Sequence, residues 1–148
     1  MSRIILFLCL LLPFYAAAQN AHKQLKKMID KDDTKALEKF LGPEGDINTC
    51  YTINESAYSL LILSIKYDAP AIFAACLLRG AEIDQICDSK SPLMYAVKYD
   101  QMEMFQALLK QGADPSLETS NGKTAYDYAL KYHRSTFIPL LSTPNDQP

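Results

Sequence analysis

Few side chains in this sequence have the type and spacing that catalysis needs. A nucleophile must lie within hydrogen-bonding reach of a base, and the 148 residues contain only two histidines, His22 and His133. Neither is well placed, because His22 lies near the N-terminus and His133 falls in a predicted turn between two helices. The five glycines leave little material for a phosphate-binding loop. We therefore expect no catalytic residue and no enzymatic activity.

The acidic residues do not form a metal-binding motif either. Asp30, Asp32 and Asp33 lack the alternating aspartates, the glycine and the terminal glutamate of a calcium loop. We interpret them as a helix end followed by the N-cap of the next helix. Since no cysteine pair has metal-ligand spacing, the sequence predicts neither a metal nor a cofactor.

The composition favours binding over chemistry. Fifteen Lys and Arg residues against seventeen Asp and Glu residues give a formal net charge of −2, so the basic excess typical of nucleic-acid binding is missing. Hydrophobic residues make up 49% and charged residues 22%, as in one globular domain. Nine tyrosines and six phenylalanines supply the kind of side chain on which protein interfaces depend.

The N-terminus has the pattern of a secretory signal peptide. Arg3 precedes an apolar run from Ile4 to Tyr15, and the small residues Ala16–Ala18 follow it. We predict a signal peptide at 1–18, cleavage after Ala18, and a periplasmic or secreted protein. The alternative is a buried helix or a membrane anchor, but the run is shorter than the roughly 20 residues that span a bilayer. No membrane span is expected in the mature form.

One sequence segment of ten residues occurs in three similar copies in the rest of the chain. Ser59–Asp68 recurs 32 residues later as Ser91–Asp100, and a further 33 residues on as Thr124–His133. Gly80 and Gly112 keep the same spacing. Each copy has the pattern of an N-cap followed by a short amphipathic helix. A second helix follows each copy, and Leu109 is on the apolar side of the one that follows Ser91–Asp100. The repeating unit is therefore helix, turn, helix, glycine and extended loop.

These residues resemble the ankyrin repeat family. Ser91–Ala96 matches that family's T-P-L-H-x-A signature with Ser for Thr and Met for His, and Gly112–Pro115 resembles its loop. The resemblance covers 21–142. It departs in the longer loop before Ser59 and at Leu60, where the family has proline. It implies an all-α solenoid of about four stacked helix-turn-helix units.

The predicted domain covers 19–142, with units near 21–44, 45–79, 80–111 and 112–142, and the tail 143–148 is expected to be disordered. The first and last units should act as caps, because a terminal repeat needs a polar outer face. The lysines expected on the outer face of the first unit are Lys23, Lys26, Lys27, Lys31, Lys35 and Lys39.

Three cysteines remain after cleavage of the signal peptide. Cys76 takes an apolar position in a second helix, so we expect a small buried hydrophobe. Cys50 and Cys87 fall in loops of neighbouring units, which run side by side. In an oxidising compartment these two are the candidates for a disulfide, and the alternative is two free thiols.

The resemblance implies where a partner binds. Lys66-Tyr67, Lys98-Tyr99 and Lys131-Tyr132 end the first helix of three successive units, at positions that line the family's concave groove. We predict that these six residues bind the partner, unless the tyrosines lie flat against the next unit as filler. The loop residues expected to extend this surface are Tyr51, Glu55, Gln85, Asp88, Glu118 and Asn121.

The sequence therefore predicts an exported, non-enzymatic binding module, monomeric, that recognises a partner protein with an acidic surface. Its role would be that of a periplasmic inhibitor or immunity factor. The alternatives are a stress-protective envelope factor that acts through cysteine redox chemistry and a secreted effector directed at a host protein. The identity of the partner and the kind of exporting cell stay open.

Overall fold

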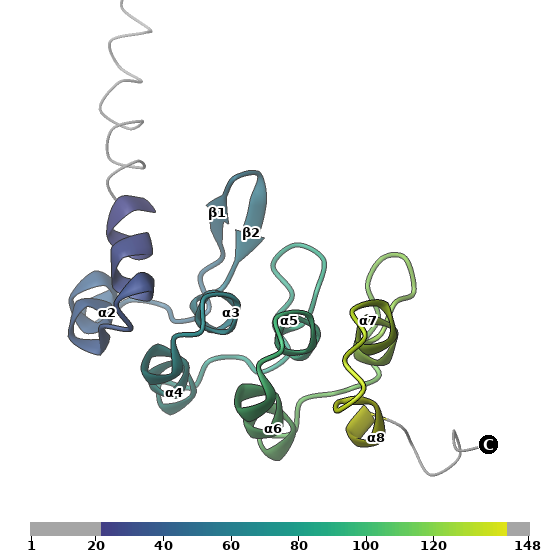
Figure 1. Ribbon diagram of the computed structural model, residues 1–148. Helices are drawn as coiled ribbons and strands as arrows, with labels where there is room; N and C mark the ends of the chain where they lie inside the picture. Colours follow the sequence, from purple (N-terminus) through teal and green to yellow (C-terminus); the bar gives the residue numbers. More distant parts are fainter. Residues whose placement is uncertain (1–21, 142–148) are drawn as a thin grey trace, which may run out of the picture.

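The computed structural model describes residues 22–141 (Figure 1), so the predicted signal peptide at 1–18 and tail at 143–148 lie outside the described residues. The first helix of the described residues covers 22–30. The elements that follow are α2 (Thr34–Leu41), β1 (Tyr51–Ile53), β2 (Ser56–Tyr58), α3 (Leu60–Lys66), α4 (Pro70–Leu78), α5 (Pro92–Lys98), α6 (Met102–Lys110), α7 (Ala125–Lys131) and α8 (Ile138–Leu141).

The helices stand side by side in two rows (Figure 1). Helices α3, α5 and α7 form one row, which we call the inner row, on the side from which the long loops project. Helices α4, α6 and α8 form the outer row. Contacts run between successive inner helices and between the two helices of each pair, so the core is the seam between neighbours.

The inner helices begin where the sequence places their N-caps. The side chains of Ser59, Ser91 and Thr124 accept hydrogen bonds from backbone N–H groups of the first helical turn. The capping at Thr124 is reciprocal, because the backbone N–H of Thr124 in turn donates a hydrogen bond to the Asp127 carboxylate. Asp33 caps α2 in the same way, which confirms its interpretation as an N-cap.

A tight left-handed turn ends the first helix of every pair. The turn residues are Asp32, Asp68, Asp100 and His133, with φ of 48°, 53°, 61° and 55°. Asp and His tolerate this conformation better than branched residues do. His133 is therefore an exposed turn residue, and the turn reverses the chain so that the second helix packs beside the first.

The core is continuous across the stack. Residues 60–65 and 92–97 of α3 and α5 are all buried, and the outer helices contribute one side each. In α6 the fully buried leucine is Leu108, and Leu109 is only half-buried at the edge of the core. Leu109, predicted on the apolar side of this helix, therefore packs against the core only in part, and Leu108 is the more deeply buried of the two.

The expectation of an all-α chain needs a correction. Strands β1 and β2 form an antiparallel hairpin in the longer loop before α3, with Tyr51 opposite Tyr58. Asn54 and Glu55 connect them with φ of 49° and 68°, as a two-residue turn that follows the twist of a hairpin requires. The extra residues of this loop thus become a short projecting finger (Figure 1).

The loops of neighbouring units are fastened together. The Asn48 side chain accepts a hydrogen bond from the backbone N–H of Glu82 at 2.8 Å, and the Gln85 side chain donates to the Asn48 carbonyl. Cys50 and Cys87 are joined in a disulfide, with their Cα atoms 5.7 Å apart. The hairpin finger is therefore cross-linked to the loop that precedes α5.

The remaining thiol in the described part of the chain is Cys76, which is completely buried in α4. Burial raises the pKa of the Cys76 thiol to about 12, although the charge of Arg79 acts in the opposite direction. A thiol with so high a pKa carries almost no thiolate near neutral pH.

The two ends of the stack differ. All six lysines expected on the outer face of the first unit are exposed. At the other end, α8 has only four residues with Pro139 in second position, and Leu130 and Leu140 are exposed. The C-terminal end is therefore the less polar one.

Candidate functional site

The candidate site lies at the ends of the inner helices. Lys66, Lys98 and Lys131 are the last residues of α3, α5 and α7, and a tyrosine forms the C-cap of each helix. Because the preceding residues of α3 and α5 are buried, these ends are where both helices reach solvent. Tyr67 is 43% exposed, whereas Tyr99 and Tyr132 are half-buried.

Lys66 is held by the tyrosine at the foot of the hairpin finger. Its Nζ donates a hydrogen bond of 3.1 Å to Tyr58 Oη and lies 4.2 Å from the centre of the Tyr58 ring. Burial alone would raise the pKa of Tyr58, but the hydrogen bonds from Lys66 and Ser56 and the charge of Lys66 outweigh it and lower that pKa. Burial lowers the pKa of Lys66, but the hydrogen bond to Tyr58, together with electrostatic interactions with Tyr67, Tyr58 and Tyr99, outweighs burial and raises that pKa.

The next two units pair tyrosines within one helix. Tyr95 and Tyr99 are stacked at 6.2 Å between ring centres and 3° between planes, and Tyr128 and Tyr132 at 6.1 Å and 10°. Both pairs are spaced i, i+4, which brings side chains together on one helix face. Tyr99 and Tyr132 therefore each stack on a tyrosine of their own helix, and Tyr99 is also packed in part against the core.

Lysines join these pairs into one surface. Lys98 lies 5.1 Å from the ring centre of Tyr99, and Lys131 lies 5.6 Å from that of Tyr132. Lys90 lies 5.7 Å from the ring centre of Tyr95 and 5.9 Å from that of Tyr128, so it bridges two units. These are cation–π distances.

We call this set the tyrosine–lysine surface. Tyr58 completes it, because its ring lies 5.9 Å from that of Tyr95. Its members are Tyr58, Lys66, Tyr67, Lys90, Tyr95, Lys98, Tyr99, Tyr128, Lys131 and Tyr132. Its side chains are in contact across three units, but Tyr58 and Tyr95 are buried, with 8% and 4% of their surface exposed, so a partner reaches mainly the lysines and the other tyrosines.

The positive charge of the surface affects the pKa of Lys90. Burial lowers the pKa of the Lys90 ammonium, and the charges of Lys98 and Lys131 lower it further, whereas Asp88 acts in the opposite direction. Lys90 therefore lies in the positive field of Lys98 and Lys131, and a negatively charged partner would relieve this repulsion.

Sequence reasoning missed two members of this surface and gave two others only a packing role. Tyr58 and Lys90 occupy equivalent positions, directly before the N-caps of α3 and α5. Comparing this position between the repeat units could have identified both residues from the sequence. Tyr95 and Tyr128 do pack between the repeat units, but their rings also stack on the rings of Tyr99 and Tyr132.

The predicted loop residues divide into two groups. The ring of Tyr51 lies 5.7 Å from that of Phe40, and Gln85 is hydrogen-bonded to Asn48, so both are occupied in packing the loops. The other four predicted loop residues, Glu55, Asp88, Glu118 and Asn121, are exposed. The loops thus add an acidic rim beyond the basic helix ends.

Comparison with known families decides the fold family. A family model described as ankyrin repeats (3 copies) matches residues 14–119 and again 60–147. The chain belongs to the ankyrin repeat family. No curated protein is significantly similar to it. Ankyrin repeats are in general protein–protein interaction modules, and a protein is the class of partner that the family indicates.

Within residues 22–141, no group of three His, Cys, Asp or Glu side chains is placed to hold a metal ion. No helix in the same range is long and apolar enough to cross a membrane.

Proposed function

We propose that this ankyrin repeat protein is exported and binds an acidic surface of one partner protein through its tyrosine–lysine surface. The role we propose is that of an inhibitor or immunity factor that neutralises a toxin or enzyme in the periplasm, acting as a monomer. The helix pairs would be four repeat units, the first and last of them caps. The observation that carries the proposal is the lysine and tyrosine repeated at the ends of α3, α5 and α7.

The chemistry of the surface supports an acidic protein partner. Tyrosine offers a large amphipathic contact with few rotatable bonds, and it is enriched at the centres of protein interfaces. Four lysines supply positive charge beside the rings, and two of them depress the pKa of a third. Complementary charge accelerates encounter with such a partner and restricts which proteins bind.

The disulfide and the N-terminal residues support export. Disulfides between loops persist in oxidising compartments and are rare in the cytosol. Cys50 and Cys87 are joined, and the N-terminal sequence has the arrangement that signal peptidase cleaves. The intact mass of the protein from its native cell should correspond to a chain that begins at Gln19, and retention of Met1 in a cytosolic fraction would contradict export.

The redox alternative finds less support. A redox factor needs an accessible thiol of low pKa. Cys76 is buried and its pKa is raised by that burial to about 12, while Cys50 and Cys87 are bonded to each other.

The test is capture of a partner with matched variants. Mature wild-type protein, Tyr99→Ala and Lys98→Glu are immobilised and incubated with native envelope extract. Lys110→Glu is the control, because it makes the same charge change on the exposed side of outer helix α6. We expect one protein to be retained by wild type and by the control, and lost or weakened in the other two.

Affinities for the captured protein then test the mechanism. Tyr99→Ala should weaken binding by about 2 kcal/mol, or roughly thirtyfold, while the melting temperature changes little. Lys98→Glu should mainly slow association and reduce its salt dependence. Full binding by both variants would refute the proposal, and the partner site would then lie elsewhere.

A further inference from the structure

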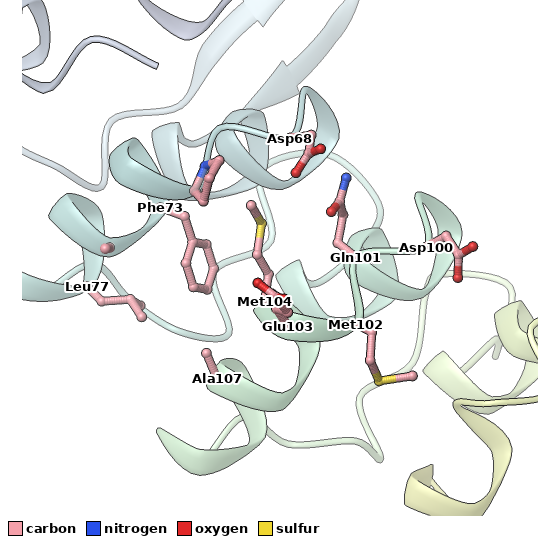
Figure 2. Close-up of a pocket in the computed structure, with 11 residues that line it drawn as sticks. Asp68, Phe73, Leu77, Asp100, Gln101, Met102, Glu103, Met104 and Ala107 are labelled. Atoms are coloured by element: carbon pink, nitrogen blue, oxygen red, sulfur yellow. The ribbon is translucent and has the colours of Figure 1, made fainter.

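A groove lies on the outer row and reaches the turns that follow α3 and α5, where Asp68 and Asp100 line it next to the C-cap residues Tyr67 and Tyr99. It runs between α4 and α6 and has a volume of about 640 Å³ (Figure 2). Phe73 and Leu77 line it from α4, and Met104 and Ala107 line it from α6. The floor of this outer groove is therefore apolar.

The solvent-facing side of α4 continues this apolar surface. Ala71, Ala74 and Leu78 are all exposed, Leu78 to 89%. The residues at the same repeat positions of α6 are Glu103, Gln106 and Lys110, which are also exposed. Folding therefore does not require apolar residues at these positions, and α4 differs from its neighbour where only solvent or a partner can be in contact.

The same junction leaves a turn carboxylate unpaired. In the preceding unit the Asp32 carboxylate accepts hydrogen bonds of 2.8 Å from the backbone N–H groups of Ala71 and Ile72, so it caps α4. In the following unit Asp100 forms an ion pair with Arg134 at 2.9 Å. The Asp68 carboxylate has neither a hydrogen bond nor an ion pair within residues 22–141, and Asp68 lies at one end of the groove (Figure 2).

Charge therefore selects the occupant. Asp68 and Glu103 line the groove with carboxylates that have no ion-pair partner among the described residues, Asp100 lines it with its carboxylate paired to Arg134, and no described lysine or arginine lines it. An anionic segment would be repelled, and a purely apolar one would leave Asp68 without a partner. A segment with an apolar side chain beside a cation matches both the floor and the rim.

We infer that the outer groove docks a segment of a partner protein that presents a large apolar side chain next to a lysine or arginine. The apolar side chain lies against Phe73 and Met104, and the cation pairs with Asp68. This site is opposite in charge to the tyrosine–lysine surface, so it binds a different surface from the one proposed there. Its test is independent of that proposal.

The probe is a short labelled peptide in which leucine and phenylalanine alternate with lysine and arginine. Two companion peptides replace either the cations by glutamate or the apolar residues by serine. Binding to the mature protein is measured by fluorescence polarisation. The methionine methyl groups are labelled with ¹³C and observed by NMR, because Met102 and Met104 line the groove whereas Met94 is buried in α5 and Met28 lies in the first helix.

Two variants identify the groove. Ala74→Lys places a cation and extra bulk in the groove at an exposed position, and Gln106→Lys makes the same charge change at the matching position of α6, outside the groove lining. Ala74→Lys should weaken binding of the basic apolar peptide by at least about tenfold, while Gln106→Lys should leave it unchanged. Asp68→Asn should weaken it by about threefold or more.

The outcomes separate the possible occupants. Shifts of the Met102 and Met104 methyl groups, with neither companion peptide bound, would support the inference. Equal binding of all three peptides, unchanged affinity in Ala74→Lys, or no binding at millimolar peptide would overturn it. Shifts of the same methyl groups on raising protein concentration without peptide would also overturn it, since the occupant would then be a second copy of the chain.

Discussion

The inner helices α3 and α5 and the outer helices α4 and α6 belong to the same repeated unit but are buried in different ways. All residues of 60–65 and 92–97 are buried, so the inner helices reach solvent only at their Lys-Tyr ends. Each outer helix buries one side and leaves the other exposed. Packing therefore dictates almost every inner residue but leaves one face of each outer helix free.

This difference decides how exposed residues are interpreted. On the inner row only a few positions can carry specificity, and three units fill them with the same lysine and tyrosine. On the outer row many positions are free, so the apolar face of α4 beside the polar face of α6 reflects something other than folding. A polar face would satisfy packing equally well.

The largest effect should come from the buried side of an outer helix. Leu108→Ala should lower the free energy of unfolding by about 2 to 5 kcal/mol, because it leaves a cavity in the core. Leu109→Ala, at the half-buried edge, should cost about 1 kcal/mol. Urea unfolding of both variants measures the difference. Equal losses would mean that the helix is buried on both sides and that the contrast between the rows is wrong.

The second effect concerns the loops, which are cross-linked beside the inner row. Replacing Cys50 and Cys87 together by serine should cost about 2 to 4 kcal/mol, since the disulfide restricts the unfolded chain. Urea unfolding under non-reducing conditions measures the loss.

Thiol counting provides the control for that variant. The unreduced mature protein should show one reactive thiol, Cys76, when unfolded and none when native, because burial raises the pKa of this thiol to about 12. Three reactive thiols in the unfolded protein would show that the disulfide does not form in solution.

A smaller effect on stability should distinguish the turn residues Asp32 and Asp68. Asp32→Gly removes the carboxylate that caps α4, whereas Asp68→Gly removes one that bonds nothing within the described chain. Glycine fits the left-handed turn at both positions, so the backbone contribution cancels between the two variants. Asp32→Gly should therefore be about 1 kcal/mol less stable than Asp68→Gly in thermal unfolding. The opposite order would show that Asp68 has a structural partner.

Features that depend on neighbours in sequence were predictable. Ser59, Ser91 and Thr124 cap their helices because the cap and the amide it accepts from are three residues apart. The turn at His133 followed from the repeat in the same way. These elements are specified by local geometry, which a repeating sequence displays directly.

Features that depend on the path of a loop were not predictable. The hairpin turn at Asn54 and Glu55 has no glycine, so it lacks the usual signal for two left-handed residues. The contacts of Tyr58 with Lys66 and of Lys90 with the Tyr95 and Tyr128 rings depend on how the loops deliver these residues to the helices. The unpaired state of Asp68 also depends on the spacing of α4 and α6, which the sequence alone does not reveal.

We expect the smallest effect on stability at the exposed apolar face of α4, where this helix differs most from α6. Leu78→Gln should change the free energy of unfolding by less than about 0.5 kcal/mol, because Leu78 is 89% exposed and loses little burial on substitution. Lys110→Gln, at the same repeat position of α6, is the matched control. A loss of about 2 kcal/mol for Leu78→Gln would show that this leucine is covered in the folded protein. The apolar face would then belong to the core, and both rows would be constrained by packing alike.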